Sequence, residues 1–151
     1  MKKISILLAA IFLLFINRSF SQSGQVPVFN HTTIYVVDLD KSAAFYEKVI
    51  GIQKIEEPFK DARHVWFKTG QRGQLHVVKG STAITTHDIN IHLAFSVTSL
   101  GEFMKHLDSL NVNYGDWKER NKQTQARPDG VRQIYFQDPD GYWIEVNDDK
   151  N

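Results

Sequence analysis

The chain has 151 residues, with 18 Lys and Arg against 17 Asp and Glu, and it contains no cysteine. The lack of cysteine excludes disulfide bonds, thiolate metal sites and a cysteine nucleophile. The basic excess comes from the first 21 residues, because without them 15 basic side chains stand against 17 acidic ones. A near-neutral chain without a basic stripe gives no reason to expect binding to nucleic acid.

Residues 1–21 are predicted to be a secretory signal peptide. A basic start precedes an apolar run over 4–16, and the small-x-small pattern at 19–21 is typical of a cleavage site. The run is shorter than the about 20 apolar residues that a membrane-spanning helix needs. We therefore expect an exported protein, periplasmic or secreted, with no stable membrane anchor after cleavage, and a single domain over residues 22–151.

The expected domain contains an internal repeat, in which residues about 28–79 correspond to about 90–148. Each copy opens on a histidine at the start of a β-rich run, His31 in the first and His92 in the second. The repeat therefore predicts two modules built alike.

A helix is expected after the first strand of each module. In the first, Asp40 is the expected N-cap and Gly51 the left-handed stop. In the second, Ser99 opens a capping-box pattern and Asn111 replaces the glycine. Apolar side chains at helical spacing between these limits are expected to face the core.

Three further strands are predicted in each module, at about 53–57, 63–68 and 74–78, then at about 113–118, 132–137 and 143–147. Both modules then have the order βαβββ, which is an α+β fold. Counting nine residues on from Phe67 gives His76, and the same count from the equivalent Phe136 gives Glu145.

The repeat predicts a metal site. If equivalent strands face each other, His31 pairs with His92 and His76 with Glu145, which brings four ligands around one pseudo-twofold axis. Three imidazoles and one carboxylate suit a divalent transition metal (Zn, Ni, Fe, Co or Mn) and not Ca or Mg, which prefer all-oxygen ligands.

Other side chains on the same strand faces are predicted to bind substrate, because residues two apart in a strand share a face. His64 with Trp66 and Gln133 with Tyr135 occupy matching positions in the two modules, although packing at the rim also explains His64. The polar loop over 118–130 carries basic side chains that would suit either an anionic substrate or plain solvation.

The chain resembles the vicinal oxygen chelate superfamily, which includes glyoxalase I, methylmalonyl-CoA epimerase, extradiol dioxygenases and fosfomycin-resistance thiol transferases. The resemblance covers about residues 28–147. It is carried by His31 with Val36-Val-Asp-Leu-Asp-Lys-Ser-Ala-Ala-Phe-Tyr-Glu-Lys-Val-Ile-Gly51, Gln74-Leu-His76-Val, His92-Leu-Ala-Phe and Tyr135-Phe-Gln-Asp-Pro-Asp-Gly-Tyr-Trp-Ile-Glu145. The Asp138-Pro-Asp-Gly141 turn is its most specific part.

The resemblance implies two βαβββ modules that form a curved mixed sheet around a divalent metal, chelated by vicinal oxygens of a small substrate. His31, His92 and Glu145 match ligand positions of the family, and Tyr135 matches a pocket tyrosine of the thiol transferases. His76 falls where glyoxalase I has a glutamate and the thiol transferases have no ligand. The family often forms homodimers, and some members build the site across subunits.

The expected activity is that of a metal-dependent lyase or isomerase of glyoxalase type. A metal that holds two oxygens of a hydroxycarbonyl compound acidifies the adjacent C–H bond, and Glu145 is the expected catalytic base. One alternative is an Fe(II) extradiol-type dioxygenase that uses His31, His92 and Glu145, with His76 as a nearby base. The other is a non-catalytic protein that sequesters a ligand, as bleomycin-resistance proteins do.

Overall fold

The structure is a computed structural model, and it describes residues 26–150. The predicted signal peptide over 1–21 lies outside the described residues. Within them, no helix has both the length and the apolar character that crossing a bilayer requires.

The first module forms one four-stranded sheet with a helix on one face. Its elements are β1 (His31–Val36), α2 (Leu39–Phe45), the π-helical turn η1 (Tyr46–Ile50), β2 (Lys54–Ile55), β3 (His64–Thr69) and β4 (Gly73–Lys79). The strand order is β1-β4-β3-β2, with β1 parallel to β4 and the other neighbours antiparallel. The strand β1 is therefore an edge strand.

The second module repeats this arrangement. Its elements are β5 (His92–Ser96), α3 (Leu100–Ser109), β6 (Gln125–Ala126), β7 (Arg132–Gln137) and β8 (Trp143–Asn147). The strand order is β5-β8-β7-β6, and β5 is the edge strand that runs parallel to β8. The predicted α+β fold of two repeated modules is confirmed, with the mixed sheet divided into two four-stranded sheets.

The helix limits agree with the sequence except at one end. Ser99 accepts a hydrogen bond from the backbone N–H of Glu102, and Gly51 ends the first helical segment with φ 81°. The predicted N-cap Asp40 is wrong, because the carboxylate of Asp38 accepts from the N–H of Lys41. Asp40 lies in the first helical turn, where an acidic side chain interacts favourably with the helix dipole.

The strand predicted at about 113–118 is absent from the second sheet, and β6 takes its place. Gly115 makes a single bridge to Tyr135, after which Asp116 accepts from the N–H groups of Lys118 and Glu119 and turns the chain. A Cβ atom on Gly115 would lie 2.0 Å from the carbonyl oxygen of Glu119. The segment folds back on itself at this glycine and does not continue along β7.

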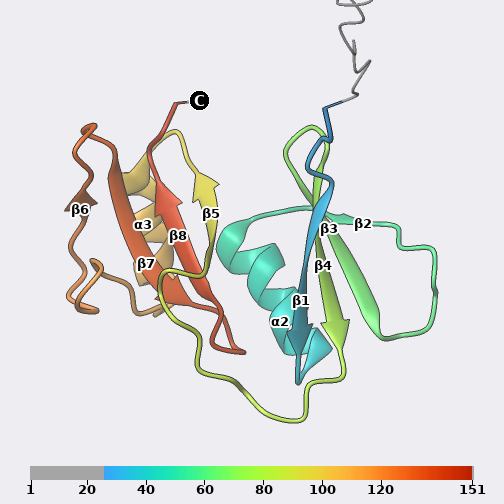
Figure 1. The fold of residues 1–151 in the computed structure, drawn as a ribbon. Helices are drawn as coiled ribbons and strands as arrows, with labels where there is room; N and C mark the ends of the chain where they lie inside the picture. Colours follow the sequence, from blue (N-terminus) through green and yellow to red (C-terminus); the bar gives the residue numbers. More distant parts are fainter. Residues whose placement is uncertain (1–25, 151) are drawn as a thin grey trace, which may run out of the picture.

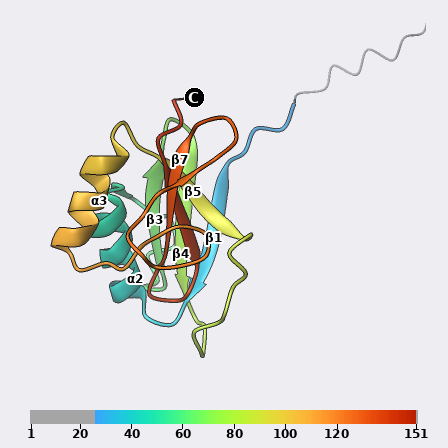
Figure 2. The same ribbon diagram turned by 90° about the vertical axis from the view of Figure 1, so that its left-hand side faces the viewer.

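Figure 2 shows that both helices lie on the same side of the two sheets. The two sheets lie next to each other (Figure 1). The helix-facing side chains of the strands form the core, as their alternation predicts. These residues are Ile34, Val36, Phe67, Leu75, Val77, Ile134, Phe136, Ile144 and Val146, each at most 2 % exposed. The opposite strand faces carry the predicted ligands.

The turn between β7 and β8 joins the two modules through buried carboxylates. Asp138 accepts a 2.8 Å hydrogen bond from the hydroxyl of Tyr46, and Asp140 accepts bonds from the hydroxyl of Ser42 and the N–H of Val37. Burial raises the pKa of Asp138, although the hydrogen bond from Tyr46 works against that shift. Helix α2 of the first module is thereby fixed against the second module.

Replacing Tyr46 with Phe tests this connection. At neutral pH the variant should lose about 2 kcal/mol of unfolding free energy, because a buried, hydrogen-bonded carboxylate loses a donor. The raised pKa of Asp138 means that folding favours the protonated carboxyl. Stability contributed by Asp138 is therefore present at low pH and is lost as pH rises through its folded pKa. The loss caused by Tyr46→Phe should accordingly shrink in acid, where the acceptor is neutral.

Urea unfolding of both proteins at neutral and acidic pH provides the measurement. Tyr114→Phe is the matched control, because its hydroxyl contacts the exposed carboxylate of Asp108 at 3.3 Å and should matter less. An equal loss for Tyr46→Phe at both pH values would contradict the assignment.

Candidate metal and substrate site

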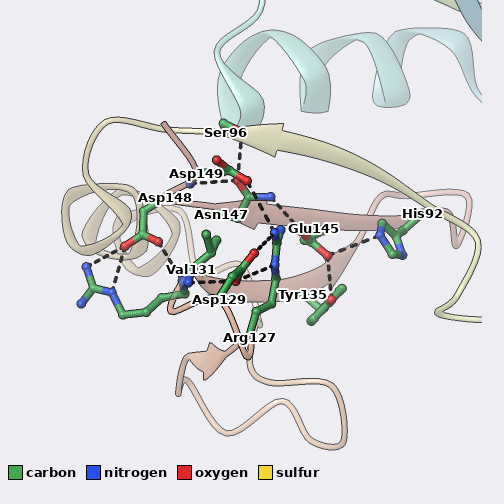
Figure 3. A network of polar contacts seen from close by, with 11 residues as sticks. His92, Ser96, Arg127, Asp129, Val131, Tyr135, Glu145, Asn147, Asp148 and Asp149 are labelled. Carbon is green, nitrogen blue, oxygen red and sulfur yellow. Dashed lines mark hydrogen bonds and ion pairs between the residues drawn. The ribbon is translucent and has the colours of Figure 1, made fainter. Parts of the chain in front are cut away.

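The carboxylate of Glu145 is held from three sides on the face of the second sheet opposite its helix (Figure 3). The residue is buried, at 6 % exposed. Oε2 accepts a 2.6 Å hydrogen bond from the Tyr135 hydroxyl and lies 3.3 Å from Nε2 of His92, while Oε1 accepts a 2.7 Å bond from Asn147. Burial and the contact with Glu145 raise the pKa of Tyr135, so the phenol stays protonated and donates.

The amide of Asn147 is oriented by its own partners. Its oxygen accepts hydrogen bonds from the Ser96 hydroxyl at 2.9 Å and from the N–H of Asp149 at 3.2 Å, which leaves its NH₂ group to donate to Glu145. Sequence reasoning assigned no role to Ser96, whereas strand alternation placed Asn147 on the same face as Glu145. The sequence pattern could have identified both residues, because Asn147 is two residues from Glu145 and Ser96 is paired with Asn147 between β5 and β8.

His92 presents the nitrogen that a metal would need. Its Nδ1 lies 2.7 Å from the carbonyl oxygen of Ile89, which can only accept, so Nδ1 carries a proton, while Nε2 faces the carboxylate of Glu145. Two atoms bound to one metal at about 2.1 Å lie roughly 3 Å apart. The 3.3 Å between His92 Nε2 and Glu145 Oε2 fits a shared metal ion.

The other two predicted ligands lie together on the open face of the first sheet. The rings of His31 and His76 stack with centroids 4.2 Å apart, and the far face of His76 stacks on Trp66 at 3.8 Å. His31 is exposed and His76 is 9 % exposed. Burial, with smaller effects of His31 and His64, lowers the pKa of His76.

The two histidines of this stack differ in which nitrogen is engaged. Nδ1 of His31 lies 2.7 Å from the side-chain oxygen of Asn30, so His31 and His92 both engage Nδ1 with an oxygen. His76 shows the opposite arrangement, because its Nε2 lies 2.8 Å from the side-chain oxygen of Gln74. Metal-binding histidines in proteins commonly donate their second N–H to an oxygen acceptor, and all three histidines have such a contact, through Nδ1 in His31 and His92 and through Nε2 in His76.

The predicted substrate-binding residues also divide between the two sheets. Trp66 and His64 lie on β3, next to His76 on β4, and Gln133 and Tyr135 lie on β7, next to Glu145 on β8. His64 is held by Asp61 at 2.8 Å and stacks on Phe59. Among the described residues, two buried side-chain atoms have no partner, Nε1 of Trp66 and Oε1 of Gln133.

The structure does not bring the four predicted ligands together. His92 meets Glu145 and His31 meets His76, but residues 26–150 contain no cluster of three or more His, Asp or Glu side chains able to hold a metal. A cleft of about 600 Å³ beside β5 touches only His92 among the predicted ligands. We refer to His31 with His76 as the first half-site and to His92 with Glu145 as the second half-site.

The remaining described histidines lie elsewhere. His106 is exposed on α3, and its Nε2 lies 2.9 Å from the carbonyl oxygen of Lys48. His87 is half-buried and stacks on Tyr142 at 4.2 Å. Neither belongs to a half-site.

Two βαβββ modules with imidazole and carboxylate groups on their open faces define a glyoxalase-like protein. The chain belongs to the Glyoxalase/Bleomycin resistance protein/Dioxygenase superfamily, whose family model matches residues 28–146. The predicted family is therefore confirmed.

Individual relatives differ in the activities that their names state. The chain is 32% identical over 128 residues to the metallothiol transferase FosB of Lysinibacillus sphaericus, covering 78% of this chain and 79% of that protein. It is 25% identical over 151 residues to the lactoylglutathione lyase of Pseudomonas putida, covering 79% and 83%.

Among solved structures, the fold is similar to that of a variant of the fosfomycin resistance protein FosX from Listeria monocytogenes. The TM-score is 0.64 at 21% identity, and the match covers 82% of this chain and 91% of that one. That protein was solved with Mn(II) and a dihydroxypropylphosphonic acid.

The hydrogen bond from Tyr135 to Glu145 gives a testable prediction. In metal-free protein, Tyr135→Phe should lower the unfolding free energy by about 2 kcal/mol at neutral pH, because a buried carboxylate loses a charge-assisted donor. Tyr142→Phe is the control, because that hydroxyl donates to the neutral backbone carbonyl of Tyr35. Urea unfolding in the presence of a chelator measures both. A smaller loss for Tyr135→Phe than for Tyr142→Phe would refute the assignment.

Proposed function

We propose that this protein is a metal-dependent enzyme of glyoxalase type, whose site combines the first half-site of one copy with the second half-site of another. His31 of one copy and His92 with Glu145 of its partner are the proposed ligands. The substrate is a small molecule that chelates the metal through vicinal oxygens. The 3.3 Å approach of His92 Nε2 to Glu145 Oε2 is the observation that carries this proposal.

A site shared between two copies follows from the arrangement of the modules. Each half-site lies on the face of its own sheet opposite the helix, next to an edge strand, β1 or β5, that has no hydrogen-bonded neighbour on its outer side. Asp138 and Asp140 fix α2 against the second module, and residues 26–150 of one chain hold no group of three or more possible ligands. A second copy would supply the missing half.

The donor set fits a divalent transition metal of the group Zn, Ni, Fe, Co and Mn. The Nε2 atoms of His31 and His92 and the carboxylate of Glu145 are nitrogen and oxygen donors, and no thiolate is available. A bound metal would act as a Lewis acid toward substrate oxygens and acidify a neighbouring C–H bond.

The residues around Glu145 suit a proton-transfer step. Its carboxylate is the base, and Tyr135 and Asn147 hold it by hydrogen bonds in one orientation. Gln133 fixes the Tyr135 hydroxyl by donating to it at 2.8 Å. The unpartnered Oε1 of Gln133 and Nε1 of Trp66 are the acceptor and donor that we assign to substrate binding, with His64 at the rim.

The lactoylglutathione lyase among the relatives supports the lyase or isomerase activity, although the expected export makes a glutathione adduct an unsuitable substrate. Two histidines and one glutamate are also the ligand types of non-haem Fe(II) dioxygenases, which makes an extradiol-type dioxygenase the second candidate. A ligand-sequestering protein is the third. Export through residues 1–21 and a periplasmic or secreted location stay predictions.

Mixing two inactive variants tests the shared site. His31→Ala and Glu145→Ala should each abolish stoichiometric metal binding as homodimers, because every site lacks one ligand. In a heterodimer of the two variants, one of the two sites regains His31 from one copy and His92 with Glu145 from the other. We expect about half a metal per chain in purified heterodimer, measured by elemental analysis.

Dimer formation itself is measured by analytical ultracentrifugation. His106→Ala, on the exposed side of α3, is the control variant and should keep full metal content. Metal bound by monomeric wild-type protein, or no recovery in the heterodimer, would refute the shared site.

The proposed proton transfer is tested by hydrogen exchange into small α-hydroxycarbonyl compounds in D₂O, followed by proton NMR. Metal-loaded wild-type protein should accelerate exchange at the carbon next to the carbonyl. Glu145→Gln should slow that exchange by about 100-fold or more, because it removes the base. If instead Fe(II)-loaded protein consumes O₂ with a catechol and catalyses no exchange, the dioxygenase is correct. Binding without either reaction would indicate a sequestering protein.

A further inference from the structure

His76 has a ring environment unlike that of His31 and His92. Its ring lies between two others, parallel to Trp66 within 3° at 3.8 Å and to His31 within 13° at 4.2 Å. Both faces of the imidazole are therefore covered, and the side chain is 9 % exposed. A ring held in this way cannot turn without disturbing both neighbours.

The hydrogen bonds of the three histidines separate His76 from the other two. His31 and His92 each use Nδ1 to donate to an oxygen, which leaves Nε2 of His31 without a hydrogen bond to the described residues and Nε2 of His92 facing the carboxylate of Glu145. His76 donates through Nε2 to the side-chain oxygen of Gln74 at 2.8 Å. The nitrogen that the two proposed ligands would offer to the metal is thus already bound to a neutral amide in His76.

His31 needs support that its own strand does not supply. It is the first residue of the edge strand β1, and it is exposed. Its hydrogen bond to the adjacent Asn30 fixes the proton position, and the stack on His76 is the contact that fixes the plane of the ring. Restricting a ligand before the metal arrives reduces the entropy lost on binding.

We propose that His76 is a positioning residue and not a metal ligand: stacked between Trp66 and His31, it holds the His31 ring with Nε2 directed at the metal. This inference rests on the proposed function, and it assigns to His76 a different role from the one that the nine-residue spacing predicts. The protein ligands are then His31, His92 and Glu145. Three ligands leave more than one coordination position for the two oxygens of a chelating substrate.

The experiment compares His76→Phe with His76→Ala in the full chain, using Co(II) and Zn(II) as probes. His76→Phe keeps a flat ring in the stack but has no donor atom, so it should bind one metal per site with a Kd within about threefold of wild type. His76→Ala removes the ring and should weaken binding by about 10- to 100-fold. The Co(II) absorption spectrum of His76→Phe should match that of wild type, because the ligand set is unchanged.

Trp66→Leu provides an independent variant, because the indole side chain of Trp66 cannot act as a metal ligand. Removing its ring should loosen the stack and weaken metal binding in the same direction as His76→Ala, at unchanged stoichiometry. Trp66→Phe should restore most of the affinity. Thermal unfolding and ultracentrifugation verify that each variant is a folded dimer.

The outcomes separate this inference from the proposed function. If His76→Phe loses metal as His31→Ala does, or changes the Co(II) spectrum, His76 is a ligand and the inference is wrong. If His76→Ala or Trp66→Leu binds metal as tightly as wild type, His76 has no positioning role and the inference is also wrong. If wild-type protein binds no stoichiometric metal, the proposed function fails, and this inference fails with it.

Discussion

The buried carboxylates of the turn between β7 and β8 determine how the rest of the molecule is arranged. Asp138 and Asp140 accept hydrogen bonds from Tyr46, Ser42 and the N–H of Val37, which ties the first module to the second. These acceptors are nearly fully buried, so the bonds cannot be exchanged for water without cost. Both helices lie on one side of the sheets, and the strand faces that carry the predicted ligands lie on the other.

The separation of the half-sites follows from this connection. Each half-site is held by contacts that do not involve the other: Tyr135 and Asn147 donate hydrogen bonds to Glu145, while Gln74 hydrogen-bonds to His76 and Trp66 stacks on its ring. Neither half depends on a contact across the molecule for its geometry. A chain with two preformed halves is suited to being completed by a second copy.

The repeat and the strand alternation predicted much of this from sequence. They placed His31, His76, His92 and Glu145 on the open faces, and the apolar neighbours of each on the core side. Periodicity reports which face a residue occupies, and it contains no information on whether two faces of one chain meet. That depends on the buried bonds of Asp138 and Asp140, which join positions about 100 residues apart in sequence.

Local errors also have local causes. The N-cap is Asp38 and not Asp40. Either aspartate satisfies the sequence pattern of an N-cap, and only the backbone conformation decides between them. The tautomers of the histidines depend on the oxygens of Asn30, Gln74 and Ile89, of which one is a backbone carbonyl that any residue would provide.

The division of ligands between two open faces has a consequence for how the protein responds to its own concentration. A metal held by His31 of one copy and Glu145 of another binds the dimer and not the monomer. By linkage, metal then strengthens association by the same factor by which association strengthens metal binding. Diluting the protein and chelating the metal would then shift the same equilibrium between monomer and dimer. The metal would contribute to the subunit contact as well as to the reaction.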